Sequence, residues 1–289
     1  MQLPRIDFSG VDPSAPGAGR WAAVRAQVVH ALATFGCFDA HYPALSSDLR
    51  AALFDGAVSE LFALPAGTKP RNSYGADKPL YGYLGDIPNL ATAYESLAIA
   101  DRVEPERVQA FADLMWPDGG NDGFCETVHG AAKRMAELEE AVRRMLMEGL
   151  GVAQYHGALS ESTRHVFRMS QYKAPGGAGA GAGEKEVRYG AHQDCNTLTV
   201  VCQHQVNGLE AWTNDRVHAP FHRVSVGGDA ARYSAVFFAL PEFKIEAPDE
   251  LVDEEHPPRF KPHHTSEFIR FCVAQGARHE DKLEAFCGN

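Results

Sequence analysis

The sequence predicts an α+β fold, with helices dominating the first half of the chain and strands the second. Apolar residues recur at helical spacing from residue 124 to 150, which gives the longest predicted helix. Beyond it, residues 165–172 alternate between polar and apolar side chains, and residues 232–238 are also strand-like. With 289 residues, 45% of them apolar, the chain can bury a sizeable core, as one large domain or two modest ones.

Composition excludes several classes of partner. The formal net charge of -11 and the pI of about 5.6 argue against nucleic acid or an anionic membrane. The first residues lack the charged start and apolar run of a signal peptide, and no apolar run approaches the ~20 residues of a membrane span. The six cysteines are scattered without a CxxC pair, which indicates reduced thiols and a cytoplasmic protein.

The N-terminal region is predicted to alternate between strands and helices. Residues 3–8 and 37–41 are predicted to be short strands. Between them, apolar residues recur at helical spacing until Gly36 ends the helix. Ser46 and Ser47 are N-cap candidates for a second helix.

Three later stretches are predicted to contain loops. Residues 72–122 have little periodicity and many Gly, Pro and Tyr residues. Residues 176–183 are almost pure Gly and Ala, which predicts a flexible hairpin connection and not a phosphate-binding loop. The chain after Leu240 is loop-rich and acidic, and one more helix is expected over residues 266–286.

A His-x-Asp pair, His192 and Asp194, leads into a Thr/Val-rich run that predicts a strand. Residues two apart on a strand share a face, so the pair forms two thirds of a 2-His-1-carboxylate site. Such a site suits non-haem Fe(II), because three protein ligands leave coordination positions open. His222 can supply the third ligand. His218 is the rival, although Pro220 argues against a helix that would place both histidines on one metal-binding face.

Arg232 and Ser234 form a second pair on a strand-like run, and they too share a face. A guanidinium beside a hydroxyl is well matched to a carboxylate, which the guanidinium can bind through two parallel hydrogen bonds. The pair therefore predicts an anion-binding site.

The order of these motifs, His192-x-Asp194, then His222-Arg223-Val224, then Arg232-x-Ser234, resembles the plant-type 2-oxoglutarate- and Fe(II)-dependent dioxygenases, which are isopenicillin-N-synthase-like. The resemblance covers nearly the whole chain and favours His222 over His218. It implies a double-stranded β-helix, or jelly-roll, core with flanking N-terminal helices.

The resemblance also implies the ligands of each cofactor. Fe(II) would be bound by His192, Asp194 and His222, and no catalytic residue is expected beyond these three. The co-substrate 2-oxoglutarate would be bound by Arg232, Ser234 and Tyr172, and O₂ would be the other co-substrate. The family usually has Asn-x-Tyr where this chain has Ser170-x-Tyr172, so the tyrosine carries over and the asparagine does not.

The implied activity is oxidation of a small organic substrate, such as a specialised metabolite or a hormone, by a monomer. The nearest branch is that of the glucosinolate-side-chain and auxin-oxidising enzymes. In the family the region of residues 72–122 covers the mouth of the barrel, which makes Tyr81, Tyr83 and Trp116 candidate substrate contacts. The alternative, which the sequence favours equally, is that these aromatic residues fill gaps under long loops and do not contact the substrate.

The resemblance divides the chain into four regions. Residues 1–120 would be the N-terminal dioxygenase region with the substrate-side loops, and residues 121–162 a long helix that bridges to the core. Residues 163–245 would be the Fe(II)/2-oxoglutarate jelly-roll domain, in shortened form, and residues 246–289 a C-terminal loop and helix.

One departure from the family affects the core. Only 27 residues separate Asp194 from His222. The family has a further hairpin and strand after the position of Glu210, so on the order of 20–30 residues, about two strands, are missing. The sheet is therefore expected to be incomplete, and an inactive remnant of such an enzyme is the alternative function. A zinc hydrolase is a third hypothesis, but it leaves the Arg-x-Ser pair unexplained.

Overall fold

The computed structural model describes residues 3–75, 78, 80–101, 103–175, 185–206, 209–212 (backbone only), 220–254, 257–275 and 282–288. Its α-helices are α1 (Trp21–Phe35), α2 (Ser47–Ala51), α3 (Ser59–Ala63), α4 (Pro105–Met115), α5 (Asp122–Gly149), α6 (His156–Ser162), α7 (Thr265–Gln275) and α8 (Lys282–Cys287). A π-helix, η1 (Ala52–Val58), joins α2 to α3, and three short 3₁₀ helices are η2 (Lys69–Arg71), η3 (Ala153–Tyr155) and η4 (Asp249–Leu251).

The strands are β1 (Arg5–Asp7), β2 (Asp39–His41), β3 (Tyr94–Ala100), β4 (Thr163–Tyr172), β5 (Lys185–His192), β6 (Leu198–Gln203), β7 (Leu209–Trp212), β8 (Phe221–Gly227), β9 (Arg232–Pro241), β10 (Lys244–Ile245) and β11 (His263–His264). A four-stranded antiparallel sheet has the order β3-β4-β9-β6, and a three-stranded antiparallel sheet has the order β5-β8-β7. β1 pairs with β2 in parallel, and β10 pairs with β11. The predicted α+β class is therefore confirmed.

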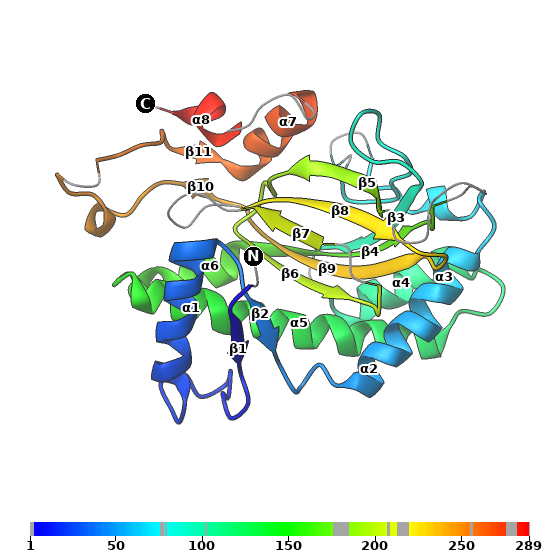
Figure 1. The fold of residues 1–289 in the computed structure, drawn as a ribbon, viewed down its shortest axis with the longest axis horizontal. Helices are drawn as coiled ribbons and strands as arrows, with labels where there is room; N and C mark the ends of the chain where they lie inside the picture. Colours follow the sequence, from blue (N-terminus) through cyan, green and yellow to red (C-terminus); the bar gives the residue numbers. More distant parts are fainter. Residues whose placement is uncertain are drawn as a thin grey trace.

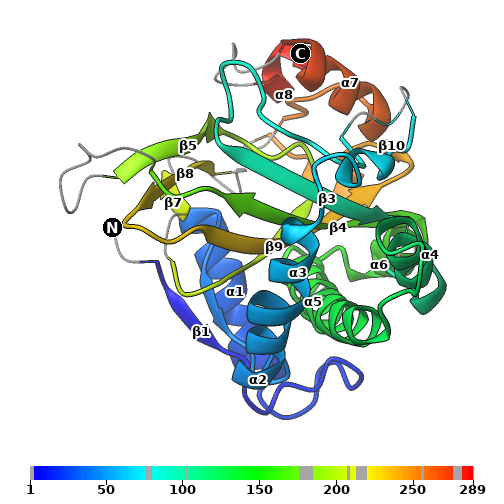
Figure 2. The same cartoon turned by 90° about the vertical axis from the view of Figure 1, so that its right-hand side faces the viewer.

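Helix α5 supports the four-stranded sheet. Its apolar face, which includes Phe124, Val128 and Met135, packs into one buried cluster with Phe167 of β4 and Phe237 of β9. Figure 1 shows α5 beneath this sheet, with α7 and α8 on the opposite side of the molecule beyond β5. Figure 2 shows β1 lying apart from the four-stranded sheet, beside α1.

The predicted helix boundaries near the N-terminus are largely confirmed. Gly36 ends α1 with a φ of 68°, in the left-handed region, and its N–H donates to the Leu32 carbonyl at 3.0 Å. Ser46 caps α2, where its Oγ accepts from the Leu49 N–H at 3.2 Å. The second predicted helix differs in its interior, which is the π-helix η1.

Two expectations for the loop-rich stretches were wrong. Residues 72–122 contain strand β3 and helix α4. In β3 both faces are buried from Leu97 onwards, so no alternation marks the strand. In addition, the C-terminal region has two helices, α7 and α8, where one was predicted. The predicted Gly/Ala connection at 176–183 lies outside the described residues.

All six cysteines are free thiols, as their scattered spacing predicts. Among the helices that the structure describes, none combines the length and the apolar character needed to cross a membrane.

Candidate metal centre and anion site

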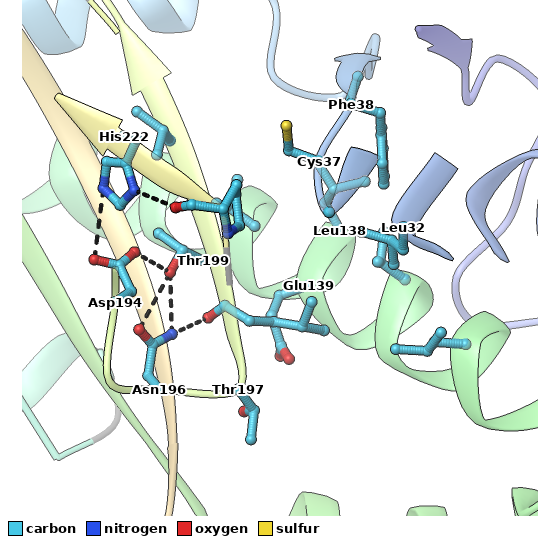
Figure 3. A pocket seen from close by; sticks show the side chains of 18 of the residues that line it. Leu32, Cys37, Phe38, Leu138, Glu139, Asp194, Asn196, Thr197, Thr199 and His222 are labelled. Carbon is cyan, nitrogen blue, oxygen red and sulfur yellow. Dashed lines mark hydrogen bonds and ion pairs between the residues drawn. The ribbon is translucent and has the colours of Figure 1, made fainter. Parts of the chain in front are cut away.

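Two adjacent strands and the loop after one of them bring the predicted metal ligands together. His192 is the last residue of β5 and lies opposite His222 of β8 in the strand register. Asp194 follows β5, and its Oδ1 lies 3.7 Å from the Nε2 atom of each histidine. One ligand atom from each of the three residues lies within 4.8 Å of the others, close enough to share one metal ion. Figure 3 shows His222 directed towards Asp194.

Backbone carbonyls orient both imidazole rings. Nδ1 of His192 lies 2.9 Å from the Gly190 carbonyl oxygen, and Nδ1 of His222 lies 3.1 Å from that of Pro220. Because a carbonyl oxygen only accepts hydrogen bonds, each Nδ1 carries a proton, and the neutral form of each ring then has its lone pair on Nε2. Burial, and then the neighbouring His222, lower the pKa of His192 to about 4, which keeps that ring neutral near pH 7. The rings are thus prepared to bind a metal through Nε2.

The carboxylate of Asp194 is oriented by a short hydrogen-bond chain. Thr199 Oγ1 donates to Asp194 Oδ2 at 2.8 Å and accepts from Asn196 Nδ2 at 3.0 Å. This leaves Oδ1 as the oxygen directed at the two histidines, and Figure 3 shows the Asp194 carboxylate between Thr199 and His222. Thr199 and Asn196 were missed by the sequence reasoning, because nothing in their spacing from Asp194 distinguishes them from other polar residues.

The predicted anion site forms where β4, β9 and β6 adjoin. Tyr172 lies opposite Arg232 in the strand register, and Ser234 lies opposite both Ser170 and Gln203. The Arg232 guanidinium lies 5.0 Å from the Tyr172 ring centre. It donates to Ser234 Oγ at 3.4 Å and to Gln203 Oε1 at 3.2 Å. Gln203 was not predicted, since only the pairing of β6 with β9 places it there.

Arg232 is a buried cation that lacks a matching anion in the described part of the chain. Its side chain is 1% exposed, and no carboxylate of a described residue forms an ion pair with it. Its Nε has no hydrogen-bond partner there. A buried, uncompensated charge is costly, so this arrangement favours a site that an anionic ligand completes.

Three tyrosine rings connect the anion site to the metal ligands. Tyr172 packs against Tyr94 with ring centres 5.1 Å apart, and Tyr94 packs against Tyr189 at 5.3 Å. Tyr189 in turn lies 4.6 Å from the ring of His192. The two sites therefore belong to one continuous packed region between the sheets.

The candidate substrate contacts each have a packing or hydrogen-bond partner within the fold. Tyr81 packs beside Ala98 and Val166, and Trp116 lies 4.9 Å from the Phe124 ring. Tyr83 donates to Glu95 Oε1 at 3.0 Å. None of Tyr81, Tyr83 and Trp116 is among the residues that line the cavity next to the metal ligands.

Two other histidines lie near the ligands in the sequence. His204, which directly follows β6, is partly buried and contacts η1 instead. Its side chain is 20% exposed, its Nε2 lies 2.9 Å from Asp55 Oδ1, and its ring lies 5.4 Å from the ring of Phe54. His218 lies outside the described residues.

Asp194 and His222 open into a large cavity of about 1520 Å³. One wall is β6, and the other consists of β2 and the residues around it, among them Cys37 and Phe38. The floor is α5, through Leu138 and neighbouring residues (Figure 3).

Sequence similarity to known proteins identifies the family of this chain. An Arabidopsis thaliana protein named "Probable 2-oxoglutarate-dependent dioxygenase AOP1.2" is 36% identical to it over 99% of this chain and 96% of the relative. The chain belongs to the 2-oxoglutarate-dependent dioxygenases. No protein-family model matches the chain.

Solved structures agree with this assignment. The dioxygenase for auxin oxidation from rice is 28% identical, with a TM-score of 0.76, and the likeness covers 99% of this chain and all of that one. The structure of JOX2 in complex with 2OG, Fe and JA has the same TM-score at 19% identity, over 100% of this chain and 90% of that one, and shows likeness of fold.

The dioxygenase family uses Fe(II), 2-oxoglutarate and O₂, and the residues present here fit these cofactors. Two imidazoles and one carboxylate converge with their lone pairs free, which is the donor set of a non-haem Fe(II) site. The orphaned Nε of buried Arg232 suits a carboxylate.

The relative also has residues that this dioxygenase lacks. The alignment with AOP1.2 spans 316 positions and includes 99% of the 289 residues here, so about 30 positions have no counterpart in this chain.

Proposed function

We propose that this dioxygenase binds Fe(II) through His192, Asp194 and His222 and oxidises a C–H bond of a small organic substrate. The observation that supports this most directly is the convergence of two Nε2 atoms and one Oδ1, which lie within 4.8 Å of one another. Fe(II), when bound, supplies the O₂ chemistry that couples substrate oxidation to conversion of 2-oxoglutarate into succinate and CO₂.

The protein's own contribution is to hold the three donor atoms in place. The Gly190 and Pro220 carbonyls fix the imidazole rings, and Thr199 fixes the carboxylate. Three ligands on one side leave the remaining positions for the co-substrates. Removing such an outer hydrogen bond typically lowers metal affinity or activity by roughly 10–100-fold.

The far carboxylate of 2-oxoglutarate is assigned to Arg232, Ser234 and Tyr172. Arg232 offers an unused donor and a buried positive charge, while Ser234 and Tyr172 add hydroxyl groups on the same sheet face. Burial raises the pKa of Tyr172, so its hydroxyl stays protonated and can donate to an anion.

The substrate class follows the relatives. The similar rice enzyme is named for auxin oxidation, and JOX2 was solved with 2OG, Fe and JA, so a plant hormone or specialised metabolite is the proposed class. Tyr81, Tyr83 and Trp116 remain the proposed substrate contacts. Buried Arg168 holds the segment that carries the two tyrosines, since it donates to the Gly82 carbonyl at 3.1 Å and also to that of Leu80.

The proposed architecture is a shortened jelly roll, made by the two antiparallel sheets and flanked by the N-terminal helices. The division at 1–120, 121–162, 163–245 and 246–289 stands as part of this proposal. The alternative function is a catalytically impaired remnant, which the roughly 30 unmatched positions favour. A zinc hydrolase has no comparable support.

Anaerobic titration with Fe(II) and then 2-oxoglutarate tests the cofactor assignment. We expect a visible charge-transfer band when both are present. Zn(II) in place of Fe(II) is the control and should give no band, because its d shell is full. Iron that binds without any band on addition of 2-oxoglutarate would contradict the assignment.

Changing Arg232 to lysine tests the anion site. Arg232→Lys keeps the charge but loses the planar fork, so 2-oxoglutarate binding should weaken by roughly 1.5–3 kcal/mol, the scale of a charged hydrogen bond. The measurement is the 2-oxoglutarate dependence of the charge-transfer band. Arg107→Lys on the exposed face of α4 is the matched control and should change nothing. Unchanged affinity in Arg232→Lys would place the co-substrate elsewhere.

A further inference from the structure

Two cysteine thiols from distant parts of the chain are in direct contact next to the metal ligands. Cys195 follows Asp194 in the loop between β5 and β6, and Cys272 is in the second half of α7. The Cys195 S–H donates a hydrogen bond to the Cys272 sulfur. Cys272 is buried, whereas Cys195 is half-buried and lines the same cavity as Asp194. A small oxidant that enters this cavity therefore reaches a pair of thiols and not a single one.

Contact with another thiol distinguishes this pair from other cysteines of the chain. Three of the others donate to backbone carbonyl oxygens within two to seventeen positions of themselves, namely Cys37, Cys125 and Cys287. Cys195 and Cys272 instead join two elements that are far apart in the sequence. A bond between their sulfur atoms would thus connect the metal-ligand loop to the C-terminal region.

The C-terminal helices have few buried side chains to hold them in place. In α7 only Thr265 and Cys272 are buried, and in α8 only Cys287 is. Packing of an apolar face provides most of the stability of a helix in a protein, so these two helices are weakly anchored. Cys272 is the point at which a buried side chain of α7 meets the loop that carries Asp194. A covalent bond at this point would have a large effect on the anchoring of α7.

The surroundings of Cys272 favour its reactive form. The hydrogen bond from Cys195 lowers the pKa of Cys272, and the ammonium group of Lys282 on α8 acts in the same direction, against the effect of burial. Lys282 also lines the cavity. The thiolate and not the thiol attacks an oxidant, so Cys272 is the nucleophile of the pair.

We propose that Cys195 and Cys272 are a modification site, at which hydrogen peroxide forms a reversible disulfide that fastens α7 to the loop carrying Asp194. The Cys272 sulfur attacks one peroxide oxygen and the O–O bond breaks, which gives a sulfenic acid and one water. The Cys195 sulfur then attacks the Cys272 sulfur, and the S–O bond breaks to release a second water. The two thiols together lose two protons and two electrons, which the peroxide gains. A dithiol reductant reverses the reaction.

Peroxide oxidation of the native full-length chain tests the proposal. A chelator is present, because free Fe(II) would convert peroxide into radicals. Remaining thiols are then blocked with a maleimide, and the tryptic peptides are analysed by mass spectrometry. We expect a cross-link between Cys195 and Cys272, with the number of free thiols falling by two from the six of the reduced chain. Dithiothreitol should restore all six.

Cys202 provides the matched control, because it also lines the cavity and no Lys or Arg separates it from Cys195. Both cysteines therefore lie on one tryptic peptide. Cys195→Ala and Cys272→Ala should each lose the cross-link, whereas Cys202→Ala should keep it. A native chain in which peroxide leaves the pair free, oxidises it without joining it, or joins either thiol to another cysteine would overturn the proposal.

Hydrogen exchange measures the anchoring of α7 in the native chain. Its amides should exchange at least fivefold more slowly in the oxidised than in the reduced form, while those of α1 should be unchanged. A cross-linked chain whose α7 amides exchange as rapidly as in the reduced form would show that the disulfide does not fasten the helix. No measurement uses Fe(II) or 2-oxoglutarate, so failure here is distinguishable from failure of the proposed function.

Discussion

Alanine in place of His192, Asp194 or His222 is expected to abolish Fe(II) binding in each single variant. Each substitution removes one of three donor atoms, and the two that remain form an inadequate site. Bound iron is measured after anaerobic loading and gel filtration, with circular dichroism as the check that each variant folds.

Two other histidines serve as controls for this loss. His30 is exposed on α1, so His30→Ala should bind iron like the parent chain. His218→Ala is expected to have little effect, because the third ligand is assigned to His222. Loss of iron in His218→Ala together with its retention in His222→Ala would show that the assignment is wrong.

Restoring the missing segment is expected to increase both stability and turnover. Unpaired buried backbone groups cost ~1–3 kcal/mol each, and a few of them equal a large part of the ~5–15 kcal/mol that stabilises a typical domain. The native chain should therefore be poorly soluble or markedly less stable than a full-length relative, with little or no 2-oxoglutarate turnover. In a strand-restored variant, which carries a hairpin and a strand copied from a close relative after Glu210, Tm should rise by on the order of 10 °C.

Thermal unfolding and succinate release are the measurements for this comparison. A second variant with a Gly/Ser insert of equal length at the same position controls for loop length alone, which costs little in a flexible connection. A native chain that forms succinate at a rate comparable with the strand-restored variant would mean that the sheets support the metal site without the extra strand. The stability argument would then fail even if the metal ligands are assigned correctly.

The sequence by itself determined the features that depend on residues close along the chain. Helix α1 ends at Gly36 because glycine adopts the left-handed conformation there without strain, and α5 is visible in its apolar stripe. The pairing of His192 with Asp194 is also local. Arg232 and Ser234 share a face by the same local spacing. The choice of His222 over His218, and the placement of Tyr172 beside Arg232, required the resemblance to the dioxygenase family, because no local rule connects these residues to the pairs.

Some missed elements had a readable signal, and others had none. Helix α4 begins with Pro105 and carries Val108, Phe111 and Met115 on its buried face, a pattern that a finer reading of the loop region would have found. Strand β3 had no such signal, because both of its faces are buried and its apolar run lacks alternation. The π-helix η1 also had no signal in the sequence, since its buried residues fit the spacing of an ordinary helix.

Only the tertiary structure decided which distant residues adjoin. It placed Tyr172 opposite Arg232, set Gln203 against the guanidinium, and gave Asp194 the hydroxyl of Thr199. It also placed β2 and β6, each of which pairs with one strand among the described residues, along the same cavity. The physical reason is that strand register and sheet order are set by long-range backbone hydrogen bonds and by burial on both faces, and a local pattern of side chains does not specify either.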